Sequence, residues 1–238
     1  MGPVSKRVVS CYNPINGAHH LMRILAIIFA GAAFMSGAAE ARPVSYPDAW
    51  TVMLRNDVYQ NSAHIHYTLD TQHSLGLRLR YDREGDFVFT GAQLNRLFKR
   101  WNKVDSQANL YGRVALGQVT DNLDESELRL RRESDEGLFL GVSGDWETRR
   151  YFVSAAAEHW ESGRFGDYSA FHGRLGIAPY VANTGALHTW VMVEGHHRPE
   201  SRDKLAGTAL LRFFKGPSLL EVGIDDRGEP LLNYIHRF

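Results

Sequence analysis

The chain has 238 residues, enough for one domain of ordinary size. Lysine plus arginine and aspartate plus glutamate number 27 each, so there is no basic surplus of the kind that indicates a nucleic-acid partner. Cys11 is the single cysteine, which excludes a disulfide framework and a thiolate metal site in the body of the protein.

The first region with a clear pattern is a targeting segment. A positive start at Met22-Arg23 precedes an uncharged apolar run over 24–34, and Ala39-Glu40-Ala41 follows. These are the three parts of a secretory signal peptide, and the run is too short for the alternative, a membrane-spanning helix. We predict that residues 1–41 are an N-terminal extension plus signal peptide, with the start at Met22 and cleavage after Ala41. Residues 42–238 are then the folded domain.

From Trp50 onward the dominant signal is alternation of apolar and polar residues with turn residues between the runs. In 74–82, leucines and a tyrosine at odd positions interleave with Arg78, Arg80 and Asp82 at even positions. A period of two predicts β-strands. The expected strands lie near 50–55, 64–69, 74–82, 87–102 (long, with room for a bulge), 108–119, 137–147, 151–160, 169–180, 187–196, 205–214, 219–225 and 231–238.

Twelve strands form an even number, which brings both ends of the sheet to one side. With that side in the periplasm, the periplasmic connections are expected to be the short ones, at 70–72, 103–107, 148–150, 182–185 and 215–218. The opposite connections include the longer, charged ones, at 121–135, 161–167, 197–204 and 226–230. Short periplasmic turns and longer outer loops are typical of outer-membrane barrels.

A soluble barrel or sandwich is the alternative architecture, since its strands alternate too. Against it, several strands reach eight to ten residues, and full charges follow one another on the polar face. The sequence therefore predicts an all-β fold, a closed antiparallel transmembrane β-barrel of about 12 strands. Aromatic girdles at the two interfaces would use outward residues. The candidates are Trp50, Tyr81, Trp146, Tyr234 and Phe238.

The end of the chain supports this architecture. Leu232, Tyr234, His236 and Phe238 share one strand face, and the last residue is aromatic. This end resembles the closing strand of bacterial outer-membrane β-barrels. In that class, the barrel assembly machinery recognises the closing strand. The resemblance implies a Gram-negative outer membrane as the location. It implies membrane lipid, lipopolysaccharide and the barrel assembly machinery as partners, and no nucleic acid.

Parity then predicts which side chains face the lumen. The predicted lining residues are Arg55, His64, His66, Arg78, Arg80, Asp82, Arg113, Asp145, Glu147, Glu158, His172, Arg174, Glu194, Arg212, Glu221 and Asp225, with Arg237 on the same face. Basic and acidic members balance, whereas a strongly ion-selective pore would show one sign. We expect a polar interior laced with ion pairs. The matching functions are a narrow, porin-like channel for small polar solutes or a structural protein of the cell envelope.

Histidines raise the question of metal. His64 and His66 share a strand face, and a hairpin centred between Tyr59 and Gln60 would place His66 opposite Met53. Imidazole beside a thioether suits copper, so Met53, His64 and His66 form a speculative metal site. The chain weakly resembles uncharacterised barrels associated with bacterial copper resistance, which would imply a link to copper. No other cofactor is expected.

The enzyme interpretations find little support in the sequence. There is no His-x-Ser motif of the kind that barrel deacylases use, and Ser154 and His159 fall on opposite faces of one strand. We therefore predict a protein without enzymatic activity. One alternative is a hydrolase that uses Asp225-Asp226 and His196-His197 with Asp203 at the outer rim. Another is a surface binding protein that uses loop 121–135.

Overall fold

The computed structural model describes residues 44, 46–122 and 133–238, so the predicted extension and signal peptide lie outside the described residues. The described part is almost entirely strand, apart from the short 3-10 helix η1 (Gly163–Phe165). In chain order the strands are β1 (Trp50–Asn56), β2 (Gln60–Thr68), β3 (His73–Asp82), β4 (Phe87–Asn102), β5 (Ser106–Asp121), β6 (Ser134–Thr148), β7 (Tyr151–Glu161), β8 (Tyr168–Ile177), β9 (His188–His197), β10 (Leu205–Lys215), β11 (Ser218–Asp225) and β12 (Pro230–Arg237).

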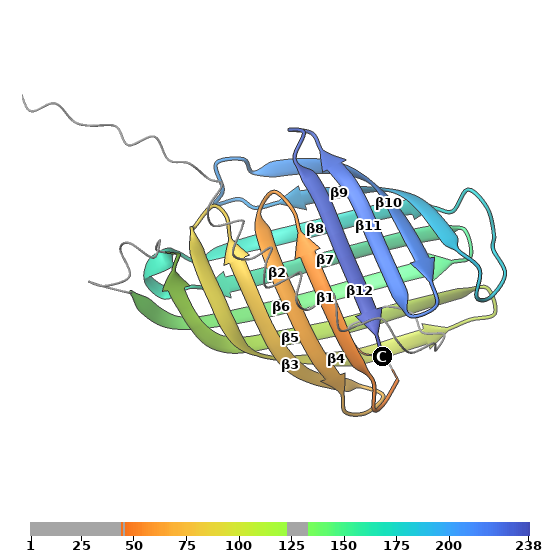
Figure 1. Cartoon of the computed structure of the whole chain (residues 1–238), viewed down its shortest axis with the longest axis horizontal. Coiled ribbons are helices and arrows are strands. Elements are labelled where there is room, and N and C mark those ends of the chain that lie inside the picture. The colour runs from red at the N-terminus through yellow and green to blue at the C-terminus, as the bar shows by residue number, and fades with distance from the viewer. Residues whose placement is uncertain (1–43, 45, 123–132) are drawn as a thin grey trace, which may run out of the picture. The chain divides into compact units, whose positions relative to one another are not determined.

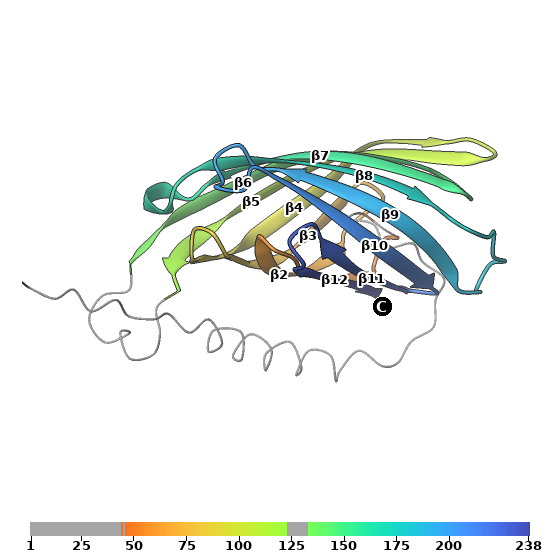
Figure 2. The same cartoon turned by 90° about the horizontal axis from the view of Figure 1, so that it is seen from above.

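The strands close into one antiparallel barrel, and each pairs with its neighbours in the sequence. β12 lies beside β1 and completes the ring (Figures 1 and 2). Two backbone hydrogen bonds extend this seam: Trp50 N donates to Phe238 O at 2.8 Å, and Phe238 N donates to Trp50 O at 3.0 Å. Closure pairs the backbone of every strand on both sides and leaves no sheet edge, as a wall in lipid requires. The predicted closed barrel is confirmed.

The barrel has two rims, which we name by their connections. The loop rim carries 57–59, 83–86, 162–167, 198–204 and 226–229, together with Asn122 and Glu133. The terminal rim carries 69–72, 103–105, 149–150, 178–187 and 216–217, together with Trp50 and Phe238. Longer loops face outward in this class, so the loop rim is the extracellular one.

One connection at the terminal rim is longer than predicted. β8 ends at Ile177 rather than at 180, and the chain pairs again only at His188, so 178–187 is a long connection. Pro179 explains the early end, because proline has no N–H to donate to a neighbouring strand. The expectation that every connection on this side is short was therefore wrong.

The first hairpin turns one position earlier than predicted, and its strand register shifts with it. The Asp57 carboxylate accepts hydrogen bonds from the backbone N–H groups of Tyr59 (2.9 Å) and Gln60 (3.0 Å), which fixes the turn. β2 begins at Gln60, and the register places His64, not His66, opposite Met53. The predicted pairing of His66 with Met53 was wrong, and His66 faces Thr51 instead.

A bulge interrupts the long β4–β5 pair. The register shifts between Leu97 and Lys99, which confirms an irregularity in the strand where the alternation was blurred. The extra residue, Phe98, reverses the parity of the strand residues after it. Trp101 consequently joins the exposed outer face near the terminal rim.

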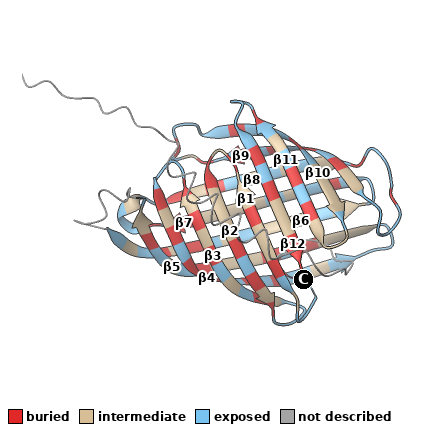
Figure 3. Cartoon of the chain, viewed as in Figure 1, coloured by how far each residue is buried: buried red, intermediate tan, exposed pale blue. Residues whose placement is uncertain are grey.

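The wall is apolar outside and polar inside, the reverse of a soluble protein. Leu77 and Leu116 are 63% and 64% exposed on the outer face, whereas Asp82 is fully buried on the inner face. Figure 3 shows this as buried and exposed positions alternating along the strands. Such an exposed apolar surface requires lipid around it, so the chain is an outer-membrane β-barrel. Among the described residues, no helix is long and apolar enough to cross a membrane.

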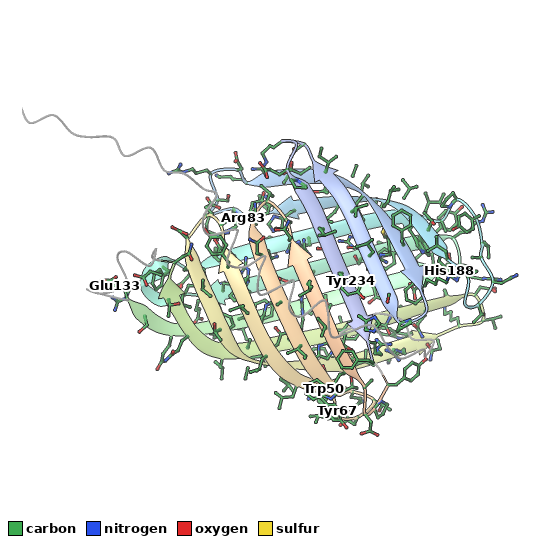
Figure 4. The ribbon with its side chains drawn as sticks, in the orientation of Figure 1. Trp50, Tyr67, Arg83, Glu133, His188 and Tyr234 are labelled. Atoms are coloured by element: carbon green, nitrogen blue, oxygen red, sulfur yellow. The ribbon has the colours of Figure 1, made fainter. Side chains whose placement is uncertain are left out.

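Aromatic side chains gather on the outside at the terminal rim. Trp50 and Tyr67 lie with ring centroids 5.3 Å apart, and Figure 4 shows them together at this edge. Trp101, Trp146 and Tyr151 are exposed at the corresponding ends of their strands. This is the position of an interfacial girdle in a membrane barrel.

Candidate functional site: the barrel interior

The strand registers place every predicted lining residue on the inner face of the wall. A first group of charged side chains forms contacts across the lumen. We call it the ion-pair belt, and its members are Arg55, Asp57, Arg174, Glu194, Arg212 and Glu221. Their charges alternate in sign along one continuous chain of contacts.

The belt crosses the lumen between strands that are not neighbours. Arg55 on β1 reaches Glu194 on β9 at 2.9 Å, although three strands separate them in the wall. Glu194 also accepts from Arg174, whose Nη1 lies 2.7 Å from Glu221 Oε1. Arg212 Nε donates to the same Glu221 oxygen at 2.7 Å. Bidentate and shared pairs of this kind are strong where water is excluded.

Asp57 anchors the loop-rim end of the belt. Its Oδ2 lies 2.6 Å from Arg55 Nε, and its Oδ1 holds the β1–β2 turn. Burial raises the pKa of this carboxyl, but the Arg55 charge and the hydrogen bonds it accepts outweigh burial and hold the pKa below its usual range. The turn carboxylate therefore stays ionised under ordinary conditions.

A second polar network closes the loop-rim half of the interior. The Asp82 carboxylate, fully buried, accepts from Arg80 Nη2 (3.0 Å), Tyr168 OH (3.0 Å) and Arg198 Nη1 (3.1 Å). Arg80 also donates to the Tyr168 hydroxyl, which joins β3 to β8 across the lumen. The Arg198 guanidinium lies 3.5 Å from the Tyr168 ring centroid. These contacts of Arg198 hold the start of loop 198–204 at the loop-rim end of the lumen.

An apolar cluster fills the space beside this network. We call it the aromatic cluster, and its large members are Phe87, Phe89, Phe139, Trp160 and Tyr168. The Phe139 and Trp160 rings lie 4.5 Å apart, and the Arg80 guanidinium stacks 4.3 Å from Trp160. The predicted polar interior is therefore interrupted by an apolar region here. Parity would have revealed Phe139 and Trp160, because they alternate with outward Leu138 and His159.

The terminal-rim half of the interior holds a cavity, which we call the vestibule. Its volume is about 650 Å³, and the inner-face side chains that line it include Asp145, Glu147, Phe152, Trp190 and Phe214. Arg174, Arg212 and Glu221 of the belt also line it. The vestibule therefore extends from the terminal rim to the belt, which forms its floor. His188, labelled in Figure 4, lies at its edge.

The remaining lining residues bridge these regions. Glu158 pairs with Arg113 at 3.2 Å, and Arg78 donates to Gln93 at 2.9 Å. His172 stacks on His196 with ring centroids 4.2 Å apart. Asp145 accepts a hydrogen bond from Asn109 at 2.7 Å.

The residues of the predicted metal site are brought together only in part. The His64 and His66 rings lie 4.7 Å apart, and Met53 is opposite His64 in the register. The ring nitrogens His64 Nε2, His66 Nδ1 and His66 Nε2 are buried without a hydrogen-bond partner. Within the described ranges, no group of three or more His, Cys, Asp or Glu could hold an ion. A site here would depend on the Met53 thioether.

The predicted rim hydrolase residues do not form a catalytic set. Arg227 lies between the acidic groups, 2.7 Å from Asp203, 3.4 Å from Asp225 and 3.8 Å from Asp226. Its guanidinium is therefore an ion-pair partner that the three carboxylates share. His197 faces outward and stacks on Phe171 instead. As for the predicted binding loop 121–135, residues 123–132 lie outside the described residues.

Sequence reasoning missed three inner groups, namely the aromatic cluster, the turn residue Asp57 and the loop residue Arg198. The inward direction of the aromatic cluster could have been predicted from the alternation along its strands. Asp57 and Arg198 lie in connections, where strand alternation does not predict the direction of a side chain, so only the folded structure shows where they point.

Comparison with known proteins gives a likeness of fold alone. No family model matches the chain, and no curated protein matches it. Among solved structures, the KdgM porin has 7% identity and a TM-score of 0.46, over 80% of this chain and 98% of the porin. LpxR from Salmonella typhimurium has 10% identity and a TM-score of 0.44, over 80% and 99%. The translocator domain of the autotransporter NalP from Neisseria meningitidis has 8% and 0.40, over 92% and 94%.

Proposed function

We propose that this chain is a structural outer-membrane barrel whose interior is closed to solutes in the state described. One observation carries the proposal: the belt joins Arg55, Glu194, Arg174 and Glu221 into a continuous bridge across the lumen. An open pore would leave these charges lining a water-filled passage rather than pairing across it. The aromatic cluster and the Asp82 network add a second closure nearer the loop rim.

The belt also supports a role in stability. The pairs Arg55–Glu194 and Arg174–Glu221 join strands that do not hydrogen-bond to each other through their backbones. They therefore hold opposite parts of the wall at a fixed distance. A narrow channel for small polar solutes is the competing function. It would admit solute from the vestibule only if the belt opened.

Conductance in a planar bilayer separates the two. For the purified full chain we expect no steady conductance above the bare bilayer. The double variant Glu194→Ala with Glu221→Ala should conduct more, because it removes the two belt carboxylates that connect Arg55, Arg174 and Arg212. Arg164→Ala is the matched control, since Arg164 pairs with Glu133 at 3.3 Å outside the lumen. Regular single-channel steps from the unaltered protein would contradict the proposal.

Copper binding is a second candidate, favoured by the unpartnered, buried ring nitrogens of His64 and His66 beside Met53. Two imidazoles and a thioether form a soft donor set that suits cuprous ion. Titration with Cu(I) should then show one site in the unaltered protein and none in the double variant His64→Ala with His66→Ala. A variant with His188→Ala, at the edge of the vestibule, should bind as the unaltered protein does. Equal binding by all three would exclude this site.

A further inference from the structure

A set of polar side chains lies on the outer face of the wall, near the loop rim. His159 on β7 and Ser169 on β8 are directly opposite in the register. Their chain neighbours point inward: Trp160 and Tyr168 belong to the aromatic cluster. Because side chains alternate along a strand, His159 and Ser169 face the lipid. A histidine–serine pair is unusual on a surface otherwise made for hydrocarbon.

The two side chains are in contact, and a carboxylate stands beside them. His159 Nδ1 lies 3.1 Å from Ser169 Oγ. On the other side of the ring, His159 Nε2 lies 3.9 Å from Glu161 Oε1. His159 and Glu161 are 44% and 54% exposed, so the set is accessible. Serine, imidazole and carboxylate in this order form the arrangement that activates a serine nucleophile.

The distances fit a resting site. The histidine–serine contact already has hydrogen-bond length. The histidine–carboxylate contact would need to shorten by about 1 Å, and contacts of this kind commonly tighten only when substrate binds. Glu161 is two residues from His159 on the same strand face, so a change of side-chain rotamer is sufficient.

The backbone beside the serine can hold an anion. Pairing between β8 and β9 begins at Phe171 and His197, so the Ser169 N–H lies beyond that ladder. It donates instead to Glu200 Oε2 at 3.2 Å. An anionic oxygen therefore already lies next to the nucleophile. The oxyanion of an acyl-transfer intermediate needs a donor of this kind.

An apolar groove leads away from the pair along the outer wall. Its volume is about 630 Å³, and His159 and Ser169 lie among its lining residues. The rest of the lining is largely aliphatic and aromatic, with Leu94, Val114, Leu140, Val142 and Phe171, and it also includes the charged Arg96, Arg113 and Glu158. Since this face contacts lipid, the fitting occupant is a fatty-acyl chain. His159 is two residues from the loop-rim end of β7, toward the interface that borders the apolar band of the wall.

We propose that His159, Ser169 and Glu161 form a site that hydrolyses fatty-acyl esters of membrane lipids. Ser169 Oγ bonds to the ester carbonyl carbon while its proton passes to His159 Nδ1. The tetrahedral intermediate then expels the lipid alcohol, which takes the proton from His159. Water attacks the acyl-serine, gives a proton to His159 and releases the fatty acid, and that proton returns to Ser169. The sum is ester plus water to alcohol plus fatty acid.

This activity was not expected from the sequence, in which Ser154 on the same strand is the candidate partner of His159 and has the opposite parity. Ser154 does face inward. The partner comes from the next strand, and only the register of β7 and β8 shows it.

The test uses the purified full chain in two arms, vesicles of phosphatidylethanolamine and vesicles of lipopolysaccharide, with fatty-acid release as the readout. Release in the first arm assigns a glycerophospholipid substrate, and release in the second assigns the acyl esters of lipid A. We expect Ser169→Ala and His159→Ala to lower the rate by at least about 10³-fold. Ser154→Ala, the inward serine of β7, should keep the full rate. Heat-modifiable migration on a detergent gel confirms that each variant is folded.

A second readout does not depend on the choice of lipid. A fluorophosphonate probe phosphonylates an activated serine with loss of fluoride, so peptide mass spectrometry should find the label on Ser169. His159→Ala should lose that label. Folded protein that releases fatty acid in neither arm and takes no label would overturn the proposal, as would a Ser169→Ala variant with the full rate.

Discussion

The two faces of β7 and β8 differ in what their polar groups do. On the inner face, Glu158 is largely and Tyr168 almost fully shielded from solvent, and both pair with arginines of other strands. On the outer face, His159 contacts Ser169, and the pair has polar contacts with Glu161 and Glu200 near the loop rim. The ion pairs and hydrogen bonds of Glu158 and Tyr168 stabilise the wall. His159 and Ser169 are accessible beside the groove and can therefore contact a ligand. The same two strands therefore serve structure on one side and, as we propose, chemistry on the other.

Neighbouring residues of β7 give the sharpest test of this contrast. Trp160→Ala should lower the free energy of unfolding by about 3–5 kcal/mol, because it empties the centre of the aromatic cluster. His159→Ala should leave stability within about 0.5 kcal/mol. Urea unfolding in detergent, followed by fluorescence, measures both. Trp146→Ala, an exposed outer tryptophan, is the control for loss of the ring itself. Equal effects of Trp160→Ala and Trp146→Ala would contradict the assignment of Trp160 to a packed core.

Breaking the belt should produce the next largest effect. Glu221→Ala leaves Arg212 and Asn233 without this acceptor and leaves Arg174 with Glu194 alone. Loss of one partner from a buried pair costs about 3–5 kcal/mol. Arg164→Ala removes an exposed rim pair and should cost no more than about 1 kcal/mol. The same urea titration applies. A Glu221→Ala variant as stable as Arg164→Ala would show that the belt does not brace the wall.

On the outer face, Glu161→Gln should lower hydrolysis about tenfold without changing stability, because the amide cannot stabilise a protonated His159. Glu136→Gln, another exposed acid of the wall, should have no effect. Initial rates of fatty-acid release measure both variants. If both retain the full rate, Glu161 has no part in the site.

The smallest expected effect is a pH dependence from the turn. The pKa of Asp57 is lower in the folded chain than in the unfolded one, so its carboxylate contributes stability above the unfolded value of about 3.9. That contribution is lost as the pH falls through the folded pKa. Between about pH 5 and pH 3, the unaltered protein should therefore lose more stability than Asp57→Asn, which keeps an acceptor for the turn. A parallel loss in both proteins would contradict the low pKa.

The sequence by itself determined the barrel. Alternation depends only on the residue types along each strand, and a strand in lipid must put apolar residues on one face and pair all its backbone groups. That is why the direction of Arg80, Asp82, Glu194 and Glu221 could be predicted from parity. Strand ends were less predictable, because Pro179 ends β8 by lacking an N–H donor and two backbone hydrogen bonds to Asp57 set the first turn.

Only the tertiary structure decided which of these residues meet. Closure brings β1 to β9 and β3 to β8 across the lumen, and no local pattern encodes a contact between strands so far apart in the sequence. The register of β7 against β8 likewise decides that His159 meets Ser169, since a shift of one residue would turn either side chain to the other face. Alternation along the sequence therefore determines which side chains face the lumen and which face the lipid. The pairing of the strands determines which of them meet in the belt and in the outer site.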